Sequence, residues 1–424
     1  MPDPKRTVEA VWRIESARLI AGLARVVRDV GLAEDLAQEA LVAALEQWPE
    51  SGVPDNPGAW LMATGRHRAI DRLRRAEVQD RKTQELALEI ERRGDAERPD
   101  LEAEIDDPFD DDLLRLIFTT CHPVLSTDAR VALTLRLLGG LTTQEIASAY
   151  LVSEATVAQR IVRAKRTLSE ARVPFEAPER DELPDRLASV LEAIYLIFNE
   201  GYAASAGDRW MRPELMEEAL RLGRILAELL PSEPEVHGLV ALMELHASRS
   251  RARTGPSGEA ILLLDQDRSR WDWMLVGRGL AALERAQSTG RALGPYTLQA
   301  AIASCHARAR TPEETDWERM VALYDALVAL TSSPVVELNR AVAVGMAFGP
   351  GAALELVDDL RSEPALESFH LLPTVRGDLL AKLGRPEEAR EEFARAAGLT
   401  QNSRERAVLL QRMAGCSPPN GMSS

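Results

Sequence analysis

Apolar residues at helical spacing form the clearest pattern of the chain, between Leu141 and Leu168. In its second half, Val157, Ile161, Ala164 and Leu168 recur at intervals of 4, 3 and 4 residues and so form one stripe of a helix. The opposite face carries small, amide and basic side chains, with two more cations on its flanks: Ala155, Gln159, Arg163 and Arg166, then Arg160 and Lys165. A shorter helix, a tight turn and such a helix are typical of a helix-turn-helix that enters the DNA major groove.

The ends of these two helices can also be predicted. Thr142 or Thr143 can cap the first helix and Ser153 the second, because a hydroxyl there accepts a bond from a free backbone N–H. At the turn, Leu151 stands where such motifs favour Gly, and a left-handed Leu would cost about 1–2 kcal/mol. We therefore expect a wider or differently built turn. A basic helix that only packs against its own domain is the alternative interpretation.

Another amphipathic helix is predicted over residues 31–48, upstream of the helix-turn-helix. Leucines mark its apolar side, and acidic and amide residues lie on or near an exposed side: Leu32, Leu36, Leu41 and Leu45, then Glu34, Asp35, Gln38 and Glu39. The loop that follows, PESGVPDNPG, is polar and rich in turn residues.

The next stretch, NPGAWLMATGRHRAIDRLRR over residues 56–75, predicts a helix with a strongly basic face. Asn56 suits the cap and Pro57 the first helical position. Five arginines give the positive face: Arg66, Arg68, Arg72, Arg74 and Arg75.

After residue 175 the pattern remains helical. Six residues from Gly377 to Ala396 follow the small/large spacing of a tetratricopeptide (TPR) repeat, without its usual Trp: Gly377, Leu380, Gly384, Ala389, Phe393 and Ala396. A weaker copy lies 36 residues earlier, from Ala341 to Leu360. Such repeats stack into a right-handed solenoid whose concave face binds peptides or proteins.

Composition narrows the class of protein. A chain of 424 residues with 45% hydrophobic and 28% charged residues suits a globular protein of several domains. No run approaches the roughly 18 apolar residues of a membrane span and the N-terminus lacks a signal core, so a cytoplasmic location without membrane contact is expected. Three distant cysteines suit a reducing compartment. Neither adjacent Cys-His pair has zinc-site spacing and no phosphate loop or hydrolase motif occurs, so we expect no metal, cofactor or enzymatic activity.

The net charge of −16 would repel DNA if it were spread evenly, but it is not. Residues 85–112 carry 3 basic and 13 acidic residues, whereas residues 113–172 carry 8 basic and 4 acidic ones. Because salt screens charges beyond about 8–10 Å, a basic segment can act within an acidic protein. The acidic run predicts an extended linker between two helical domains.

In their order, AEDLAQEALVAALEQW, PGAWLMATGRHRAIDRLRR and LTTQEIASAYLVSEATVAQRIVRAKRTL resemble a bacterial RNA polymerase sigma factor of the extracytoplasmic-function (ECF) type. YLIFNEGYAAS, RWDW and SPVVELNRAVAVG resemble the ECF group with a fused helical-repeat domain, although core packing is the alternative for Tyr202, Trp271 and Trp273. The resemblance implies a region 2-like domain over 1–84, an acidic linker over 85–112, a region 4-like domain over 113–175 and a TPR-like domain over 181–424.

The resemblance also implies roles for single residues. The acidic helix would dock on a basic coiled coil of the polymerase clamp through Asp35, Gln38, Glu39 and Leu41. The loop ending at Asn56 would hold an unstacked base of the −10 element, although it lacks the aromatic residue often seen in the family. The arginines from Arg66 to Arg75 would follow the opened strand. The −35 element would be read by Gln159, Arg160, Arg163, Lys165 and Arg166, with Lys165 on phosphate.

The sequence therefore predicts an all-α initiation factor that directs core RNA polymerase to promoter DNA, as duplex and as opened strand. Its acidic C-terminal domain would control activity through an intramolecular contact or a protein partner. Two alternatives stay open at this point: a polymerase-independent helix-turn-helix regulator with a TPR-like sensor domain, and a TPR scaffold that does not bind DNA.

Overall fold

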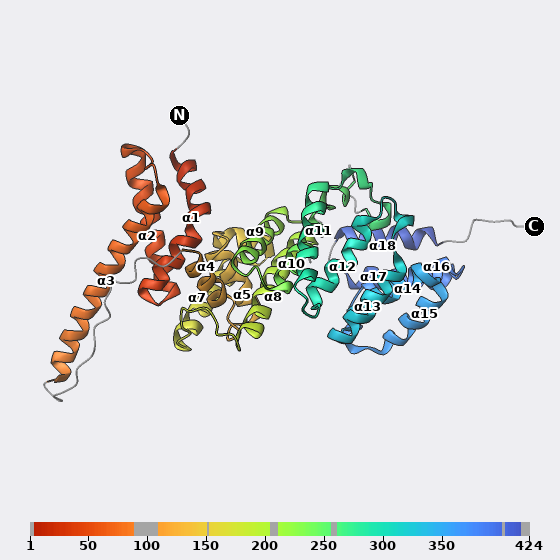
Figure 1. Ribbon diagram of the computed structural model, residues 1–424. Helices are drawn as coiled ribbons and strands as arrows, with labels where there is room; N and C mark the ends of the chain where they lie inside the picture. Colours follow the sequence, from red (N-terminus) through yellow and green to blue (C-terminus); the bar gives the residue numbers. More distant parts are fainter. Residues whose placement is uncertain are drawn as a thin grey trace, which may run out of the picture. The chain divides into compact units, whose positions relative to one another are not determined.

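The computed structural model describes residues 4–88, 109–150, 152–203, 211–255, 261–400 and 403–416. Regular secondary structure over these ranges is helical (Figure 1), which confirms the all-α prediction. The chain divides into two compact units, Met1–Ile194 and Tyr195–Ser424. None of the described helices is long and apolar enough to span a bilayer.

Helix α1 is the centre of unit 1. The unit contains α1 (Pro4–Val27), α2 (Val30–Ser51), α3 (Pro57–Leu88), α4 (Phe109–Thr120), α5 (Thr127–Leu137), α6 (Thr143–Tyr150), α7 (Glu154–Glu170) and the first part of α8 (Leu183–Tyr202). Helix α1 packs against α2 and α3 and also against α4 and α5, so it joins the two halves of the unit. Its buried side chains include Leu19, Ile20 and Leu23, which form the shared core.

The second half of unit 1 runs from α4 into the first part of α8. Helix α4 starts at Phe109, and the carboxylate of Asp112 is buried against Arg25 of α1 (3.5 Å) and Arg115 (3.0 Å). At the other end, Arg186 of α8 donates to the carbonyl of Phe118 (3.0 Å). The first part of α8 therefore belongs to the fold of unit 1.

The predicted helix ends agree with the structure. Thr142 and Glu145 form a reciprocal cap: the Glu145 N–H donates to the Thr142 hydroxyl (3.1 Å), and the Thr142 N–H donates to the Glu145 carboxylate (2.8 Å). Ser153 caps α7 by accepting from the Thr156 N–H (3.1 Å). The expected distortion at Leu151 lies outside the described residues.

Asn56 caps α3, as predicted, by accepting from the Ala59 N–H (3.0 Å), and Pro57 is the first residue of that helix. Trp48 near the end of α2 meets Trp60 near the start of α3 edge to face, with ring centroids 5.4 Å apart. The two contacts fix the entry of α3 beside the end of α2.

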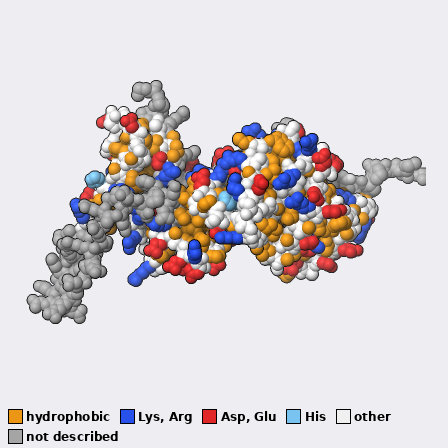
Figure 2. Space-filling view, viewed as in Figure 1, with side chains coloured by type: hydrophobic (Ala, Val, Ile, Leu, Met, Phe, Trp, Pro, Cys, Tyr) orange, Lys and Arg blue, Asp and Glu red, His pale blue; other side chains and the backbone are white. Residues whose placement is uncertain are grey.

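Unit 2 continues as helices packed on their neighbours in sequence. It holds the end of α8, then α9 (Pro213–Leu229), α10 (Pro234–Ala247), α11 (Trp273–Ser288), α12 (Pro295–Arg308), α13 (Trp317–Thr331), α14 (Pro334–Phe348), α15 (Pro350–Asp359), α16 (Leu371–Lys382), α17 (Pro386–Leu399) and α18 (Ser403–Gly415). Short 3-10 turns lie between some of them: η1 (Ser250–Ala252), η2 (Leu263–Asp265), η3 (Arg268–Arg270), η4 (Pro312–Glu314), η5 (Leu360–Ser362) and η6 (Pro364–Leu366). On the face seen in Figure 2, acidic and basic side chains are interspersed over this unit.

The small/large pattern noted in the sequence lies on the packed helices α16 and α17. A Cβ added to Gly377 would lie 2.9 Å from Cε1 of Phe393, so the absence of a side chain makes room for the ring. In the weaker copy from Ala341 to Leu360, Phe348 stands at the position of Gly384 and is 60% exposed. The TPR assignment itself remains a prediction.

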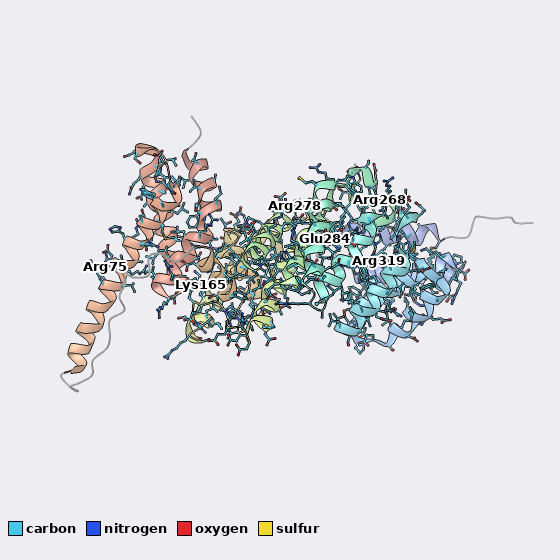
Figure 3. The ribbon with its side chains drawn as sticks, viewed as in Figure 1. Arg75, Lys165, Arg268, Arg278, Glu284 and Arg319 are labelled. Carbon is cyan, nitrogen blue, oxygen red and sulfur yellow. The ribbon has the colours of Figure 1, made fainter. Side chains whose placement is uncertain are left out.

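Two carboxylates inside unit 2 connect helices. Glu244 of α10 is buried and pairs with Arg224 of α9 (2.9 Å) and Arg278 of α11 (3.3 Å). Arg278 is labelled in Figure 3. Glu235 of α10 accepts from the backbone N–H groups of Tyr296 (2.8 Å) and Thr297 (3.2 Å), which caps the start of α12. Each is a buried or half-buried charge whose partners lie on other helices.

The aromatic residues of RWDW and YLIFNEGYAAS differ in their surroundings. Trp271 is buried, with the guanidinium of Arg268 5.0 Å from its ring, and Arg253 lies 3.6 Å from the ring of Tyr202. Trp273 is 50% exposed. Core packing therefore accounts for Trp271.

Candidate nucleic-acid and polymerase interface

Helix α7 separates an apolar face from a polar one, as its sequence predicts. Val157, Ile161, Ala164 and Leu168 are buried against the rest of unit 1. On the other side three side chains are exposed to solvent: Gln159, Arg163 and Arg166. Exposed guanidinium and amide groups on one helix face are the donors that can hydrogen-bond to base edges in a major groove.

The two flanking cations of α7 are already engaged. Arg160 pairs with Asp128 of α5 (2.9 Å), and Lys165 pairs through Nζ with Glu34 of α2. Lys165 is labelled in Figure 3. In this conformation, the lysine expected to meet phosphate is held by an acid of the other half of unit 1.

Glu34 is the centre of that contact and departs from the prediction. The sequence places it on or near an exposed side of α2, but the residue is 3% exposed. Its carboxylate also accepts from Nε of Arg136 (2.7 Å) and from Nε2 of Gln38 (2.7 Å). Two cations from α5 and α7 offset the cost of burying this acid, a contact between distant segments that helical periodicity cannot reveal.

The proposed docking residues of α2 lie in different surroundings. Asp35 is exposed, Leu41 is half-buried, and the amide of Gln38 is bound to Glu34. Glu39 faces the arginine helix, with Arg68 at 3.5 Å and Arg72 at 3.4 Å. The structure therefore leaves Asp35 exposed and brings Glu39 against α3.

The arginines of α3 lie between Arg66 and Arg75, in the second half of its described side chains. Arg72, Arg74 and Arg75 are exposed (Arg75 is labelled in Figure 3), whereas Arg66 and Arg68 are half-buried. The Asn56 side chain, expected beside an unstacked base, serves as the helix cap and remains exposed. Among the described side chains, Arg74 and Arg75 thus leave a basic surface in solvent, whereas Arg68 and Arg72 pair with Glu39 of α2.

Cys121 is buried, whereas the neighbouring His122 is half-buried. Burial raises the pKa of the Cys121 thiol, which shares a hydrogen bond with Thr134 (3.3 Å). Burial, and then the charge of Arg186, lowers the pKa of the His122 imidazole to about 4. Within the described ranges, no three His, Cys, Asp or Glu side chains gather as a metal site.

Three protein families match separate parts of the chain. A family described as Sigma-70 region 2 matches residues 14–78, and one described as Sigma-70, region 4 matches residues 115–168. A family of unknown function matches residues 186–287, which run from α8 into α11.

Similar proteins fall into two groups. An uncharacterized protein of Rhizobium meliloti (strain 1021) is 43% identical over 403 residues, which is 93% of this chain and 92% of that protein. The "Probable ECF RNA polymerase sigma factor SigI" of Mycobacterium tuberculosis is 31% identical over 170 residues, 39% of this chain and 56% of the relative. The "Probable RNA polymerase sigma-C factor" of Mycobacterium bovis is 30% identical over 164 residues, 39% of this chain and 78% of the relative.

Proposed function

Because this chain belongs to the ECF sigma factors of RNA polymerase, we propose that it binds core polymerase and directs it to promoters through a −35 and a −10 element. The observation that carries the proposal is the divided surface of α7, with Val157 and Ile161 buried and Gln159 and Arg163 in solvent. This is the arrangement that a recognition helix needs. Members of the family initiate transcription and catalyse no reaction themselves.

In the proposed complex, α7 reads the −35 element. Gln159, Arg163 and Arg166 reach base edges, and Arg160 and Lys165 meet the phosphate backbone. Lys165 can do so only after it leaves Glu34, because one ammonium group cannot occupy both positions. Contact of Lys165 with the phosphate backbone therefore requires its ion pair with α2 to break.

Helices α2 and α3 supply the other contacts. Docking on polymerase uses Asp35, Gln38, Glu39 and Leu41 of α2, and acidic and amide groups beside a leucine suit a basic partner surface. The arginines from Arg66 to Arg75 follow the phosphates of the opened −10 strand, and Asn56 lies beside the base captured there. The ion pairs of Glu39 with Arg68 and Arg72 would rearrange when both surfaces are occupied.

Unit 2 controls this activity in the proposal, through an intramolecular contact or a protein partner. Support comes from the fusion itself: the Rhizobium meliloti relative covers both units, whereas the matched part of the sigma factor relatives is 39% of this chain. A chain that ends at Ala203 tests the idea better than one cut after Arg172, because the longer piece keeps all of α8. Equal promoter-dependent transcription by the shortened and the full chain would exclude this control.

The decisive experiment for the sigma factor role is run-off transcription with purified core polymerase. Arg163→Ala should reduce promoter binding by the holoenzyme 5- to 150-fold, since one base contact contributes about 1–3 kcal/mol. The exposed Arg308 of α12 supplies the matched control, Arg308→Ala, which should transcribe as the native chain does. Tight binding of duplex DNA without polymerase would instead identify an independent regulator, and binding to neither would identify a scaffold.

A further inference from the structure

A cleft of about 980 Å³ opens in unit 1 where the ends of α1 and α7 meet the start of α2. Five of its sixteen lining residues are cations and two are acids: Arg25, Arg28, Arg115, Lys165 and Arg172, against Asp29 and Glu176. The Asp29 carboxylate accepts from the Leu32 N–H (2.7 Å), so its charge is partly directed at the helix start. Arg25 and Arg115 are already paired with Asp112, and Lys165 with Glu34, so the positive charge that favours an anion here comes from Arg28 and Arg172.

Two of these arginines have an unusual backbone. Arg28 follows α1 with φ 52°, and Arg172 follows α7 with φ 50°. At such a helix end glycine is the usual residue, because a side chain in the left-handed region costs free energy. Within the described part of the chain, no side-chain ion pair or hydrogen bond holds either guanidinium. The chain thus accepts backbone strain at two separate helix ends, and both place a cation in the same cleft.

Further donors line the walls. Nη1 of Arg25 is buried and has no hydrogen-bond partner among the described atoms. Val30 and Gly31, the first residues of α2, also line the cleft, so the positive end of that helix dipole faces it. An oxyanion there could accept from side-chain and backbone donors together.

We propose that this cleft binds a small molecule that carries a diphosphate group. Guanidinium groups pair bidentately with phosphate oxygens, and a helix start supplies backbone donors for the same charge. The volume lies within the roughly 300–1,000 Å³ of small-molecule sites. Leu168, Val173 and Phe175 add an apolar wall that can take the remainder of a nucleotide.

Such a ligand would link the two halves of unit 1. Arg25 and Arg28 belong to α1 and its end, and Lys165 and Arg172 belong to α7 and its end. A ligand that binds only this joined state stabilises it in proportion to the logarithm of its concentration. If the proposed function holds, the ligand would keep Lys165 from DNA and so lower promoter binding.

The test is calorimetric titration of the full chain with pyrophosphate, ADP and inorganic phosphate at one fixed ionic strength. The expected result is tighter binding of pyrophosphate and ADP than of inorganic phosphate. Arg28→Gly and Arg172→Gly should each weaken binding about tenfold, the usual loss for one hydrogen bond to a charged group. Because glycine relieves the left-handed strain, these variants remove a cation without the folding cost of an ordinary substitution.

Two controls separate strain from charge. Ser332→Gly relieves the same backbone conformation in unit 2 and should bind pyrophosphate as the native chain does, and Arg28→Lys should retain most of the affinity. Unchanged affinity in both arginine-to-glycine variants, or no pyrophosphate binding at millimolar concentration, would overturn the proposal. ADP binding stronger than pyrophosphate binding would identify a nucleotide as the source of the diphosphate, and the reverse order would identify the free anion. Neither polymerase nor DNA enters this assay, so its failure would leave the proposed function standing.

Discussion

The contact between Lys165 and Glu34 leads to the sharpest prediction. Lys165 joins the recognition helix to the helix proposed to dock on polymerase, and Lys165→Met removes that link while keeping an unbranched apolar stem. Glu34 would still be held by Arg136 and Gln38, so the carboxylate would not be left alone. The substitution should therefore loosen the two halves of unit 1 without unfolding either.

The magnitude follows from the burial of the pair. A hydrogen bond to a charged group contributes about 1.5–3 kcal/mol. The Glu34 side chain is 5% exposed and that of Lys165 is 21% exposed, so solvent screens the pair only in part. A loss of about 2 kcal/mol would shift the balance between closed and open forms roughly 30-fold. We propose that core polymerase docks on the open form, because Gln38 of the docking surface is bound to Glu34 in the closed one. Apparent affinity for core polymerase then rises with the open fraction, up to the same factor.

The assay is equilibrium binding of the labelled full chain to core polymerase without DNA. Lys165→Met should bind up to about 30-fold more tightly than the native chain. Promoter capture by the resulting holoenzyme should weaken uniformly across sequences, because a phosphate contact is lost. Arg163→Met is the matched control, since it removes a cation from the same helix without contact to Glu34. Equal core affinity of the two variants would refute the reasoning.

Four other substitutions test separate parts of the structure. Ser153→Ala should destabilise α7 by about 1 kcal/mol through loss of its cap, seen as a lower urea midpoint and weaker promoter binding. Gly377→Ala should lower the free energy of unfolding by about 1–3 kcal/mol, because its Cβ would lie 2.9 Å from Phe393. Gly398→Ala, with no atom within 4 Å of its Cβ, should instead stabilise α17 by about 0.5–1 kcal/mol in the same denaturation assay. Burial and nearby arginines lower the pKa of His306 from 6.5 to about 4, so protonation favours the unfolded chain as pH falls from 6.5 to 4. The urea midpoint should drop over this range by the equivalent of about 3 kcal/mol at most. His306→Gln should flatten that dependence.

Periodicity and caps predicted the helices well because both depend on residues close in sequence. The stripe from Val157 to Leu168 is buried, and Thr142 and Ser153 cap their helices as expected. The local spacing also predicted the contact between Gly377 and Phe393, because the repeat pattern places a residue without a side chain opposite an aromatic ring.

Contacts between distant segments could not be predicted in this way. Glu34 matches the polar face of its own helix, and only the approach of Arg136 and Lys165 makes its burial tolerable. The same applies to Asp112, which in sequence is one of many acids between residues 85 and 112 and in the structure, from the first turn of α4, pairs with Arg25. The left-handed backbone at Arg28 and Arg172 has no sequence signal either, because glycine is the residue that would have indicated it.

The cap that Glu235 places on α12 has a consequence for how unit 2 opens. Its carboxylate holds the N–H groups of residues 61 and 62 positions further along the chain, and α10 also packs directly against α12. In a solenoid, stability comes from each repeat and from the contacts between neighbouring repeats. Here α10, α11 and α12 share contacts that skip a helix, so their amide protons should exchange with solvent together, as one cooperative block. A partner or substitution that destabilises α12 would then destabilise α10 in the same opening event.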